Sequence, residues 1–412
     1  MIREMRIVLR NAGKINPASI DDYISAGGYK ALKKARTMDR KDLIGMLERS
    51  GNLRGRGGAG FNTGSKWGSA FQAEGPEKYV ICNADEGEPG TYKDRIIMEN
   101  DPHTVIEGIL ICAYAIGAKD CYIYCRGEYR DINALLKLAI MQAREKGLCD
   151  DVEIRVASGA GSYVCGEETA LIESLEGKRG EPRLKPPFPT VAGFRRKPTV
   201  VNNVETFASV PVIVEKGADW FRAIGSLNYP GTKLICLSGD VVHRGSIEVP
   251  TNVTIRDIVY GFGGGIQDGR AIKTVQVGGS SCGFISPEHL DISVDFESMR
   301  KIGGALGSGA VMVVDDNHNI VDILVSISEF FAHESCGKCA PCREGTLRVA
   351  ELVKRVADGE GIQADLEQIR TLADHMSRSC FCALGQSATT AISSAMSLFP
   401  NDFQSKLKAQ EV

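Results

Sequence analysis

The sequence predicts an α/β protein built from more than one domain. Segments typical of strands and helices alternate between about residues 60 and 225, and a hairpin-like pattern follows up to about residue 317. Beyond that point the apolar residues recur with the spacing of helices. The length of 412 residues suits two to three domains, because a domain holds roughly 150 residues.

Composition excludes several classes of protein. Hydrophobic residues make up 43% of the chain and charged residues 25%, as in ordinary soluble globular proteins. The formal net charge of -3 gives no electrostatic footprint for nucleic acid. The sequence has no apolar stretch that could span a bilayer, and Met1–Arg6 lacks the apolar core of a signal peptide. We therefore expect a protein with no direct membrane insertion that stays in the cytoplasm, or on the inner side of a membrane by docking to a partner.

The first half of the chain is expected to contain an arm and an α/β domain. Residues 1–60, with helices at 31–36 and 41–48, are expected to form an extended N-terminal arm that ends in the start of a glycine-rich loop. In residues 61–225, the predicted strands are 79–83, 120–125 and 152–156, and the predicted helices are 105–117 and 131–147. Their alternation indicates βαβ units around a parallel sheet.

The second half has a different pattern. In residues 226–317, a hairpin at 233–238 and 246–249, a helix at 254–260 and strands at 271–277 and 310–315 resemble a ubiquitin-like β-grasp domain of the SLBB type. In residues 318–412, apolar residues recur at threes and fours in the segments 349–356 and 366–376. With helices at 322–331 and 386–398, this spacing predicts a four-helix bundle.

The 13 cysteines fall into two groups. Eight are scattered singly, mostly in apolar runs, and are expected to be buried small hydrophobic residues. In a reducing compartment they are not expected to form disulfides. The other five lie near the C-terminus and require a chemical explanation: Cys336, Cys339, Cys342, Cys380 and Cys382.

The run Cys336–Cys342 has the spacing C-x₂-C-x₂-C, which lets three thiolates reach one iron–sulfur cube from a single loop. Cys380 or Cys382 is the fourth ligand, because two intervening helices return the chain to the same end of the bundle. A structural zinc site usually shows two C-x₂-C pairs, so we favour a [4Fe–4S] cluster. The zinc alternative makes the chain a non-catalytic docking module with a β-grasp interaction domain.

The segment Arg54–Phe61 contains G-x-G-x-x-G, but a predicted helix precedes it where the dinucleotide-binding fingerprint needs a strand. Four glycines still let a phosphate or ring approach the backbone, and Lys66 follows as a cation. Two arginines and an aromatic residue in the same loop favour contact with a cofactor over a flexible surface loop.

Polar turns follow two of the predicted strands. Asn83–Thr91 comes after the strand at 79–83, and Gly159–Thr169 comes after the strand at 152–156. Ligands bind at the carboxyl ends of parallel strands, and amides with carboxylates suit the polar groups of a flavin nucleotide. Two such loops from neighbouring strands are expected to face one crevice. Hydride transfer from a nicotinamide to a flavin needs no protein acid or base, which agrees with the lack of a catalytic triad pattern.

Several segments together resemble one family over nearly the whole chain: the flavoprotein family of the NADH-binding subunit of respiratory complex I. This family includes diaphorase subunits of soluble NAD-linked or electron-bifurcating hydrogenases and formate dehydrogenases. The segments are RGRGGAGF, NADEGEPGT, GAGSYVCGEETAL, LKPPFP, VVNNVET, ESCGKCAPCREG and CALG. The resemblance implies a Rossmann-like FMN-binding domain, with hydride passing from NADH to FMN and single electrons to the [4Fe–4S] cluster.

The resemblance also implies roles for individual residues. NADH is expected to contact Phe61, Glu88, Glu168, Lys185 and Phe188, with Glu88 and Glu168 as candidate catalytic residues. A carboxylate near the ribose disfavours the 2′-phosphate of NADPH. The residues expected to hold FMN are Gly55, Gly57, Gly58, Lys66, Asn83, Asp85, Tyr163, Gly166, Glu167, Asn202 and Asn203.

The family motif C-x-L-G matches Cys382–Gly385 and so implies Cys382, with Cys336, Cys339 and Cys342, as the cluster ligands. The implied partners are a small [2Fe–2S] thioredoxin-like subunit and a further iron–sulfur or catalytic subunit of a hydrogenase, a formate dehydrogenase or complex I. The N-terminal segment looks more like the soluble enzymes and the total length more like complex I, and we lean slightly to the soluble enzymes. Ser69 stands where family members often carry an aromatic residue beside the adenine.

Overall fold

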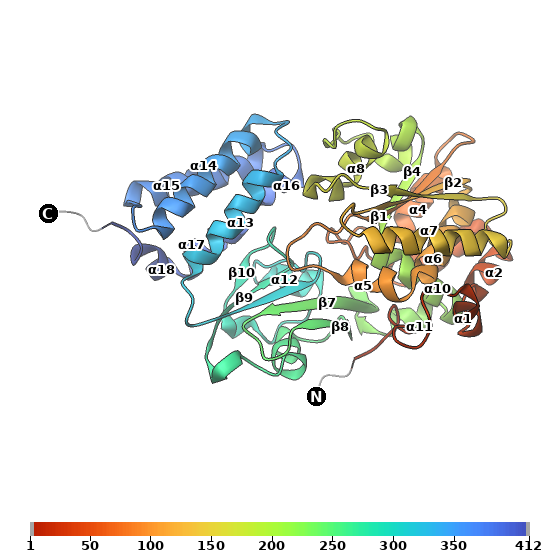
Figure 1. The fold of residues 1–412 in the computed structure, drawn as a ribbon, viewed down its shortest axis with the longest axis horizontal. Coiled ribbons are helices and arrows are strands. Elements are labelled where there is room, and N and C mark those ends of the chain that lie inside the picture. The colour runs from red at the N-terminus through yellow and green to blue at the C-terminus, as the bar shows by residue number, and fades with distance from the viewer. Residues whose placement is uncertain (1–3, 409–412) are drawn as a thin grey trace.

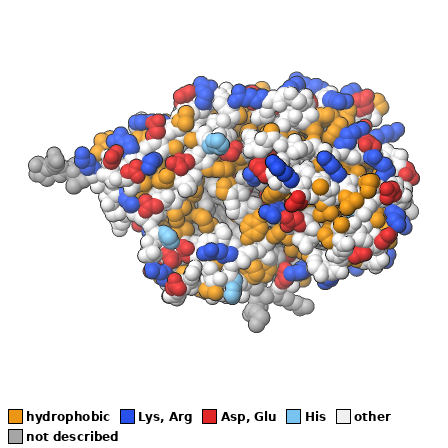
Figure 2. All heavy atoms as spheres, viewed as in Figure 1, with side chains coloured by type: hydrophobic (Ala, Val, Ile, Leu, Met, Phe, Trp, Pro, Cys, Tyr) orange, Lys and Arg blue, Asp and Glu red, His pale blue; other side chains and the backbone are white. Residues whose placement is uncertain are grey.

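The computed structural model describes residues 4–408. Its elements gather in three regions: an α/β region at the right of Figure 1, a mixed sheet at the lower centre and a helical bundle at the left. Lys and Arg side chains are interspersed with Asp and Glu side chains over the face in Figure 2. None of the helices within residues 4–408 is both long and apolar enough to cross a membrane.

The α/β region is built on a parallel sheet, as the sequence predicts. Its strands are β1 (Tyr79–Ala84), β2 (Asp120–Cys125), β3 (Glu153–Ser158) and β4 (Thr199–Asn203), in the order β3-β2-β1-β4. Alternate residues of the strands face opposite sides, so that Val80 and Cys82 join one hydrophobic core while Tyr79 and Ile81 join another. The strand β4 was not predicted.

Helices cover both faces of this sheet. On one face, α6 (Pro102–Ile116) is buried on nearly all sides and packs on α10 (Val204–Lys216) and β1, and α7 (Arg130–Glu145) packs on β3. On the other face, Ala170, Leu171 and Ile172 of α8 (Glu168–Leu175) lie in the core that holds Tyr79 and Ile81. The other elements of the region are α4 (Thr63–Gln72), α5 (Lys93–Asn100), η1 (Tyr163–Gly166), α9 (Pro189–Ala192), η2 (Phe194–Arg196) and α11 (Ala218–Arg222).

The N-terminal segment is packed rather than extended, which corrects the prediction of an extended arm. Its helices α1 (Ile20–Ser25), α2 (Lys30–Arg36) and α3 (Arg40–Arg49) bury side chains in the same core as α6 and α10. The buried carboxylate of Glu107 on α6 accepts hydrogen bonds from the backbone N–H groups of Tyr29 and Leu32, both at 2.9 Å. A buried carboxylate needs such partners, so Glu107 fixes where this segment attaches.

The second sheet is mixed. Its strands β7 (Thr232–Gly239), β8 (Gly245–Pro250), β9 (Ile272–Val277), β10 (Phe284–Ile285) and β11 (Ala310–Asp315) lie in the order β10-β9-β11-β7-β8. Only β11 and β7 are parallel to each other among these pairs. The helical turn predicted at 254–260 is a π-helix, η3 (Asp257–Phe262). Smaller elements are β5 (Gly225–Ser226), β6 (Tyr229–Pro230), η4 (Gln267–Gly269), η5 (Pro287–His289) and α12 (Phe296–Lys301).

The C-terminal region consists of helices. The longer ones are α13 (Ile320–Glu334), α14 (Ala340–Ala357), α15 (Gln363–Ser379) and α17 (Thr390–Leu398), and the short ones are α16 (Ala383–Ser387) and α18 (Pro400–Gln404). The apolar residues whose spacing predicted α14 and α15 are buried in one core, among them Val349, Leu352, Leu366 and Ile369. The loops that carry the clustered cysteines lie where α14 and α16 begin.

A second buried carboxylate holds the start of the chain against β8. Glu248 accepts hydrogen bonds from the backbone N–H groups of Ile7, Val8 and Leu9 at 2.9 to 3.1 Å.

We expect Glu248→Ala to lower the free energy of unfolding by about 3 kcal/mol, because each buried N–H that loses its acceptor costs about 1–3 kcal/mol. Urea denaturation measures this change. The control Glu288→Ala removes an exposed carboxylate, and equal midpoints for the two variants would contradict the prediction.

Candidate functional site

A large cleft opens at the carboxyl ends of β1 and β4, with a volume of about 1300 Å³. Loops of the second sheet and the start of α16 complete its wall. All the residues that the resemblance assigns to FMN and NADH lie on this wall: Gly55, Gly57, Gly58, Phe61, Lys66, Asn83, Asp85, Glu88, Tyr163, Gly166, Glu167, Glu168, Lys185, Phe188, Asn202 and Asn203. The structure thus brings together residues that are distant in sequence.

The two polar turns do not come from neighbouring strands, which corrects the sequence analysis. β2 lies between β1 and β3, so the turn Asn83–Thr91 and the turn Gly159–Thr169 start two strand positions apart. They meet because the second turn crosses toward β1: the side-chain amide of Asn83 donates to the carbonyl of Gly166 at 2.8 Å.

The glycine-rich loop forms a cradle on one side of the cleft. A Cβ at position 57 would lie 3.0 Å from the Cβ of Asn203, and Gly58 has a φ of +129°, which is strained for other residues. Neither Arg54 nor Arg56 of this loop lies on the cleft wall: Arg54 stacks on Phe296, and the guanidinium of Arg56 is buried behind the loop. The arginines therefore do not supply the cofactor contact that the sequence suggested.

Carboxylates on the β1 side of the cleft are poorly solvated. Burial raises the pKa of Asp85 to about 7, and its Oδ2 atom is buried without a hydrogen-bond partner from the protein. Burial also raises the pKa of Glu88, while hydrogen bonds from Tyr163 and Ser281 oppose the shift. The Tyr163 hydroxyl donates to Glu88 Oε2 at 2.5 Å, and the Ser281 N–H donates to Oε1 at 3.1 Å.

These features fit FMN. The glycines leave room for a phosphate or ring against the backbone, and the unpartnered Asp85 oxygen is available to a polar group of a ligand. Lys66 supplies the positive charge: its Nζ lies 3.3 Å from Glu168 Oε2 and 3.0 Å from the carbonyl of Val201. The chain's own residues thus offer the donors and acceptors that a flavin mononucleotide requires.

The mouth of the cleft carries exposed aromatic side chains. Phe61 is 56% exposed and Phe188 is 53% exposed, an unusual state for large apolar side chains that face a cleft. Beside them, Lys185 Nζ lies 2.9 Å from Glu167 Oε1 and 3.5 Å from Glu168 Oε1. Planar apolar surfaces next to charged groups suit a nicotinamide adenine dinucleotide. Ser69 also lies on this wall.

Several residues on the cleft wall come from segments that the sequence did not single out. Ser281, Cys282, Gly307 and Ser308 reach the cleft from loops of the second sheet, and Lys93 reaches it from the start of α5. Lys93 is the second residue after the polar turn, a nearness in sequence that could have drawn attention to it. The loops of the second sheet carry no local signal, because long-range packing places them there.

The cysteine loops of the helical region meet behind the α16 side of the cleft. Cys336, Cys339 and Cys342 surround the start of α14, and Cys382 is the residue that precedes α16. Cys382 lies on the cleft wall, whereas Cys380, at the end of α15, is buried and does not line the cleft. The two candidates therefore differ in position, and the choice of Cys382 as the fourth ligand stays a prediction.

The spacing of the cysteine sulfurs disfavours zinc. Within residues 4–408, the only three His, Cys, Asp or Glu ligand atoms that lie within 4.8 Å of one another belong to Asp240, Asp315 and His318. Four thiolates on one zinc ion lie roughly 3.8 Å apart, since the Zn–S distance is about 2.3 Å in a tetrahedron. A four-iron cube holds its ligands farther apart, so the cysteine arrangement fits the cluster better.

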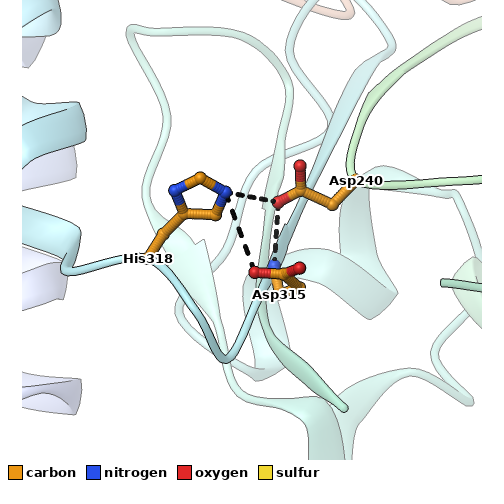
Figure 3. A group of neighbouring side chains, drawn as sticks. All are labelled: Asp240, Asp315 and His318. Atoms are coloured by element: carbon orange, nitrogen blue, oxygen red, sulfur yellow. Dashed lines mark hydrogen bonds and ion pairs between the residues drawn. The ribbon is translucent and has the colours of Figure 1, made fainter. Parts of the chain in front are cut away.

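Asp240, Asp315 and His318 form a separate group, in which the side chains point toward one another (Figure 3). These side chains form hydrogen bonds and ion pairs with other groups of the protein. Asp240 Oδ2 accepts from the Asp315 N–H at 3.0 Å and lies 3.4 Å from His318 Nε2, and Arg270 Nε lies 3.6 Å from Asp315 Oδ2. The group connects the ends of β7 and β11 to the segment that leads into α13.

Comparison with known proteins agrees with this geometry. Residues 49–212 match the family model of the Nuo51 FMN-binding domain, and residues 322–406 match that of the NADH-ubiquinone oxidoreductase-F iron-sulfur binding region. The F 2 subunit of the NADH-quinone oxidoreductase of Rhizobium meliloti (strain 1021) is 47% identical over 405 residues, which cover 96% of this chain and 96% of that protein. The chain belongs to this family.

Other family members act in hydrogenases. NADP-reducing hydrogenase subunit HndC of Solidesulfovibrio fructosivorans is 45% identical over 410 residues, covering 98% of this chain and 83% of that protein. A chain of an NAD⁺-reducing [NiFe]-hydrogenase in the H₂-reduced state superposes with a TM-score of 0.88 and 36% identity, over 100% of this chain and 68% of that chain. The predicted family is confirmed, with FMN and a [4Fe–4S] cluster as cofactors and NADH as substrate.

The two candidates for the fourth cluster ligand can be separated by substitution. We expect Cys382→Ala to lose iron and the EPR signal of the reduced cluster, because the family motif C-x-L-G matches Cys382–Gly385 at the start of α16. Cys380→Ala is the matched control, since it lies two residues away and should keep both. Iron loss in Cys380→Ala with a normal cluster in Cys382→Ala would reverse the assignment.

Proposed function

We propose that this chain is the NADH-oxidising subunit of a multi-subunit electron-transfer complex. The observation that carries the proposal is the single cleft that has an FMN cradle inside, exposed aromatic side chains at its mouth and Cys382 in its wall. Bound FMN accepts a hydride from NADH and releases the electrons one at a time. The chain's own residues bind and orient the two nucleotides and position the cluster beside them.

In this proposal, the residues divide between the two nucleotides. Gly55, Gly57, Gly58, Lys66 and the polar residues at the ends of β1 and β4 hold FMN, together with Asp85, Tyr163, Gly166 and Glu167. Phe61, Lys185 and Phe188 hold NADH at the mouth. Glu88 and Glu168 also line the cleft and are the candidate catalytic residues.

We further propose that the nucleotide is NADH rather than NADPH. Lys185 at the mouth is paired with Glu167 and Glu168, and Glu168 also pairs with Lys66, which is assigned to FMN. The basic run Arg195-Arg196-Lys197 does not line the cleft. At the mouth, a 2′-phosphate would therefore meet carboxylates and a lysine that is already paired with them. The name of HndC shows that a relative reduces NADP, so this property needs a direct test.

The domain division is also part of the proposal. The order β10-β9-β11-β7-β8, with the parallel pair in the centre, supports a β-grasp domain at 226–317. The helices after residue 318 support a four-helix bundle for the cluster, and the parallel sheet supports a Rossmann-like FMN domain at 61–225. Residues 1–60 contribute to the core of that domain.

The assembly and its compartment follow from the same reasoning. The hydrogenase relatives support a soluble NAD-linked or bifurcating hydrogenase or formate dehydrogenase, and the NADH-quinone oxidoreductase relatives support the equivalent place in complex I as the second candidate. We favour the soluble assembly slightly. We propose a cytoplasmic location; none of the 13 cysteines, all of which lie within the described residues, is paired in a disulfide.

NADH oxidation by the purified protein tests the proposed function. The protein should show flavin and iron–sulfur absorbance and reduce ferricyanide with NADH, with a kcat/KM for NADPH at least about tenfold lower, equivalent to about 1.4 kcal/mol. Glu168→Gln should narrow this preference, because it removes a carboxylate at the mouth. A colourless protein that contains zinc would contradict the function, whereas equal kcat/KM values would contradict only the nucleotide choice.

The proposal also requires a partner. Hydride brings two electrons, whereas an iron–sulfur cluster passes single electrons, so a second carrier must dock near the cysteine loops, where Lys338 and Arg343 lie. We expect the isolated chain to reduce artificial acceptors but not the physiological one. Addition of a small [2Fe–2S] thioredoxin-like subunit, and of the catalytic subunit after it, should restore that activity. Full physiological turnover by the isolated chain would disprove the requirement.

A further inference from the structure

A group of charged side chains is buried next to the FMN end of the cleft. Arg56, Glu205 and Lys233 are 0% exposed, Lys93 is 1% exposed and Asp94 is 3% exposed. Lys93 and Asp94 lie on the cleft wall, and the other three lie behind it. Burial of one charged side chain costs several kcal/mol unless the charge is paired. A group of five buried charges at the cleft therefore suggests a functional role in addition to any contribution to stability.

Lys93 is held in place from three sides. Its Nζ lies 2.7 Å from Asp94 Oδ1 and 3.2 Å from Glu205 Oε2, and it donates to Asn203 Oδ1 at 3.1 Å. Asn203 in turn donates from Nδ2 to Asp94 Oδ2 at 2.6 Å. Burial lowers the pKa of Lys93, but the carboxylates of Asp94, Glu205 and Glu86 raise it by more, so Lys93 stays charged.

The group extends away from the cleft into the second sheet. Lys233 on β7 places its Nζ 2.5 Å from Glu205 Oε2, and the backbone N–H of Leu234 donates to Glu205 Oε1 at 2.9 Å. The guanidinium of Arg56 stacks on the ring of Tyr229 at 4.0 Å and has two buried nitrogen atoms without a partner. Glu205 therefore has cations on more than one side.

The charges do not balance. The cations Arg56, Lys93 and Lys233 oppose the carboxylates of Asp94 and Glu205. Glu86 also faces Asp94 on this side, but burial raises its pKa to about 7, so it adds less than a full negative charge near neutral pH. Burial lowers the pKa of Lys233 to about 8, which leaves it mostly charged at pH 7. The excess is positive, and of the three cations in this group only Lys93 lies on the cleft wall.

We infer that Lys93 is a positioning residue that sets the reduction potential of the FMN. The inference rests on the proposed function. A hydride carries one negative charge, so FMN that has received it is more negative by one unit than oxidised FMN. A fixed positive charge nearby, screened little because it is buried, stabilises that reduced form relative to the oxidised form. The carboxylates of Asp94 and Glu205 fix the ammonium group and partly offset its field.

Redox titration of the flavin in the holo-protein tests this inference. Lys93→Met should lower the FMN midpoint potential, Lys93→Arg should keep it near that of the wild type, and Glu205→Gln and Asp94→Asn should each raise it. Glu107→Gln is the matched control: it alters an equally buried carboxylate that does not line the cleft, and the potential should not change. The ratio of the dissociation constants of reduced and oxidised FMN should shift in the same sense.

Opposite shifts for the lysine and carboxylate variants separate an electrostatic role from a structural one. Simple loosening of the site would move Lys93→Met and Glu205→Gln in the same direction, and that result would overturn the inference. If Lys93→Met does not fold, the two carboxylate variants decide. An FMN midpoint potential that is higher in Glu205→Gln and Asp94→Asn than in Glu107→Gln supports the inference, and equal potentials overturn it. Wild-type protein that binds no FMN contradicts the proposed function instead.

Discussion

The carboxylate of Glu88 is the point at which the three regions of the molecule meet. It follows β1, accepts a hydrogen bond from the Tyr163 hydroxyl in η1 and accepts another from Ser281 in a loop of the second sheet. Tyr163 packs on Phe330 of α13, and its N–H donates to Glu334 at 2.8 Å. A buried carboxylate is costly unless it is hydrogen-bonded, so the bonds that stabilise Glu88 also hold these parts of the cleft wall together.

The sequence predicts the parts of this arrangement that are local. The apolar run of β1 followed by Asn83, Asp85 and Glu88 marks a strand end with ligand-binding groups, and the family resemblance assigns the remaining cleft residues. It does not predict β4, because Thr199–Asn203 is short and contains two asparagines, which are rare in strands. β4 exists because Ile81 pairs with Val201 across a long separation. The position of Ser281 on the cleft wall and the order of the strands likewise depend on contacts between residues that are distant in sequence.

The cysteine cluster shows the same division between local and distant information. The C-x₂-C-x₂-C spacing predicts three ligands on one loop because those residues are close in sequence. The choice of Cys382 over Cys380 depends on how α15 ends and α16 begins. The two cysteines are only two positions apart, so the sequence spacing alone does not define that local structure. In the structure, Cys382 lines the cleft and Cys380 is buried beside Cys342 and Gly385, so the two cysteines differ in position while the ligand role of Cys382 stays a prediction.

In the proposed function, hydride would enter at the exposed mouth of the cleft and electrons would leave through the cysteine loops. The exposed rings of Phe61 and Phe188 mark the mouth, whereas Cys336 and Cys339 are partly exposed but do not line the cleft. Two hydrogen bonds join the first cysteine loop to the segment 179–182. Lys338 donates to the carbonyl of Pro182 at 2.6 Å, and Arg179 donates to that of Cys336 at 2.6 Å. A partner that docks at the cysteine loops can therefore receive electrons while the mouth stays open to NADH. The same bonds keep the cluster at a constant position relative to the cleft, which a transfer of single electrons between fixed groups requires.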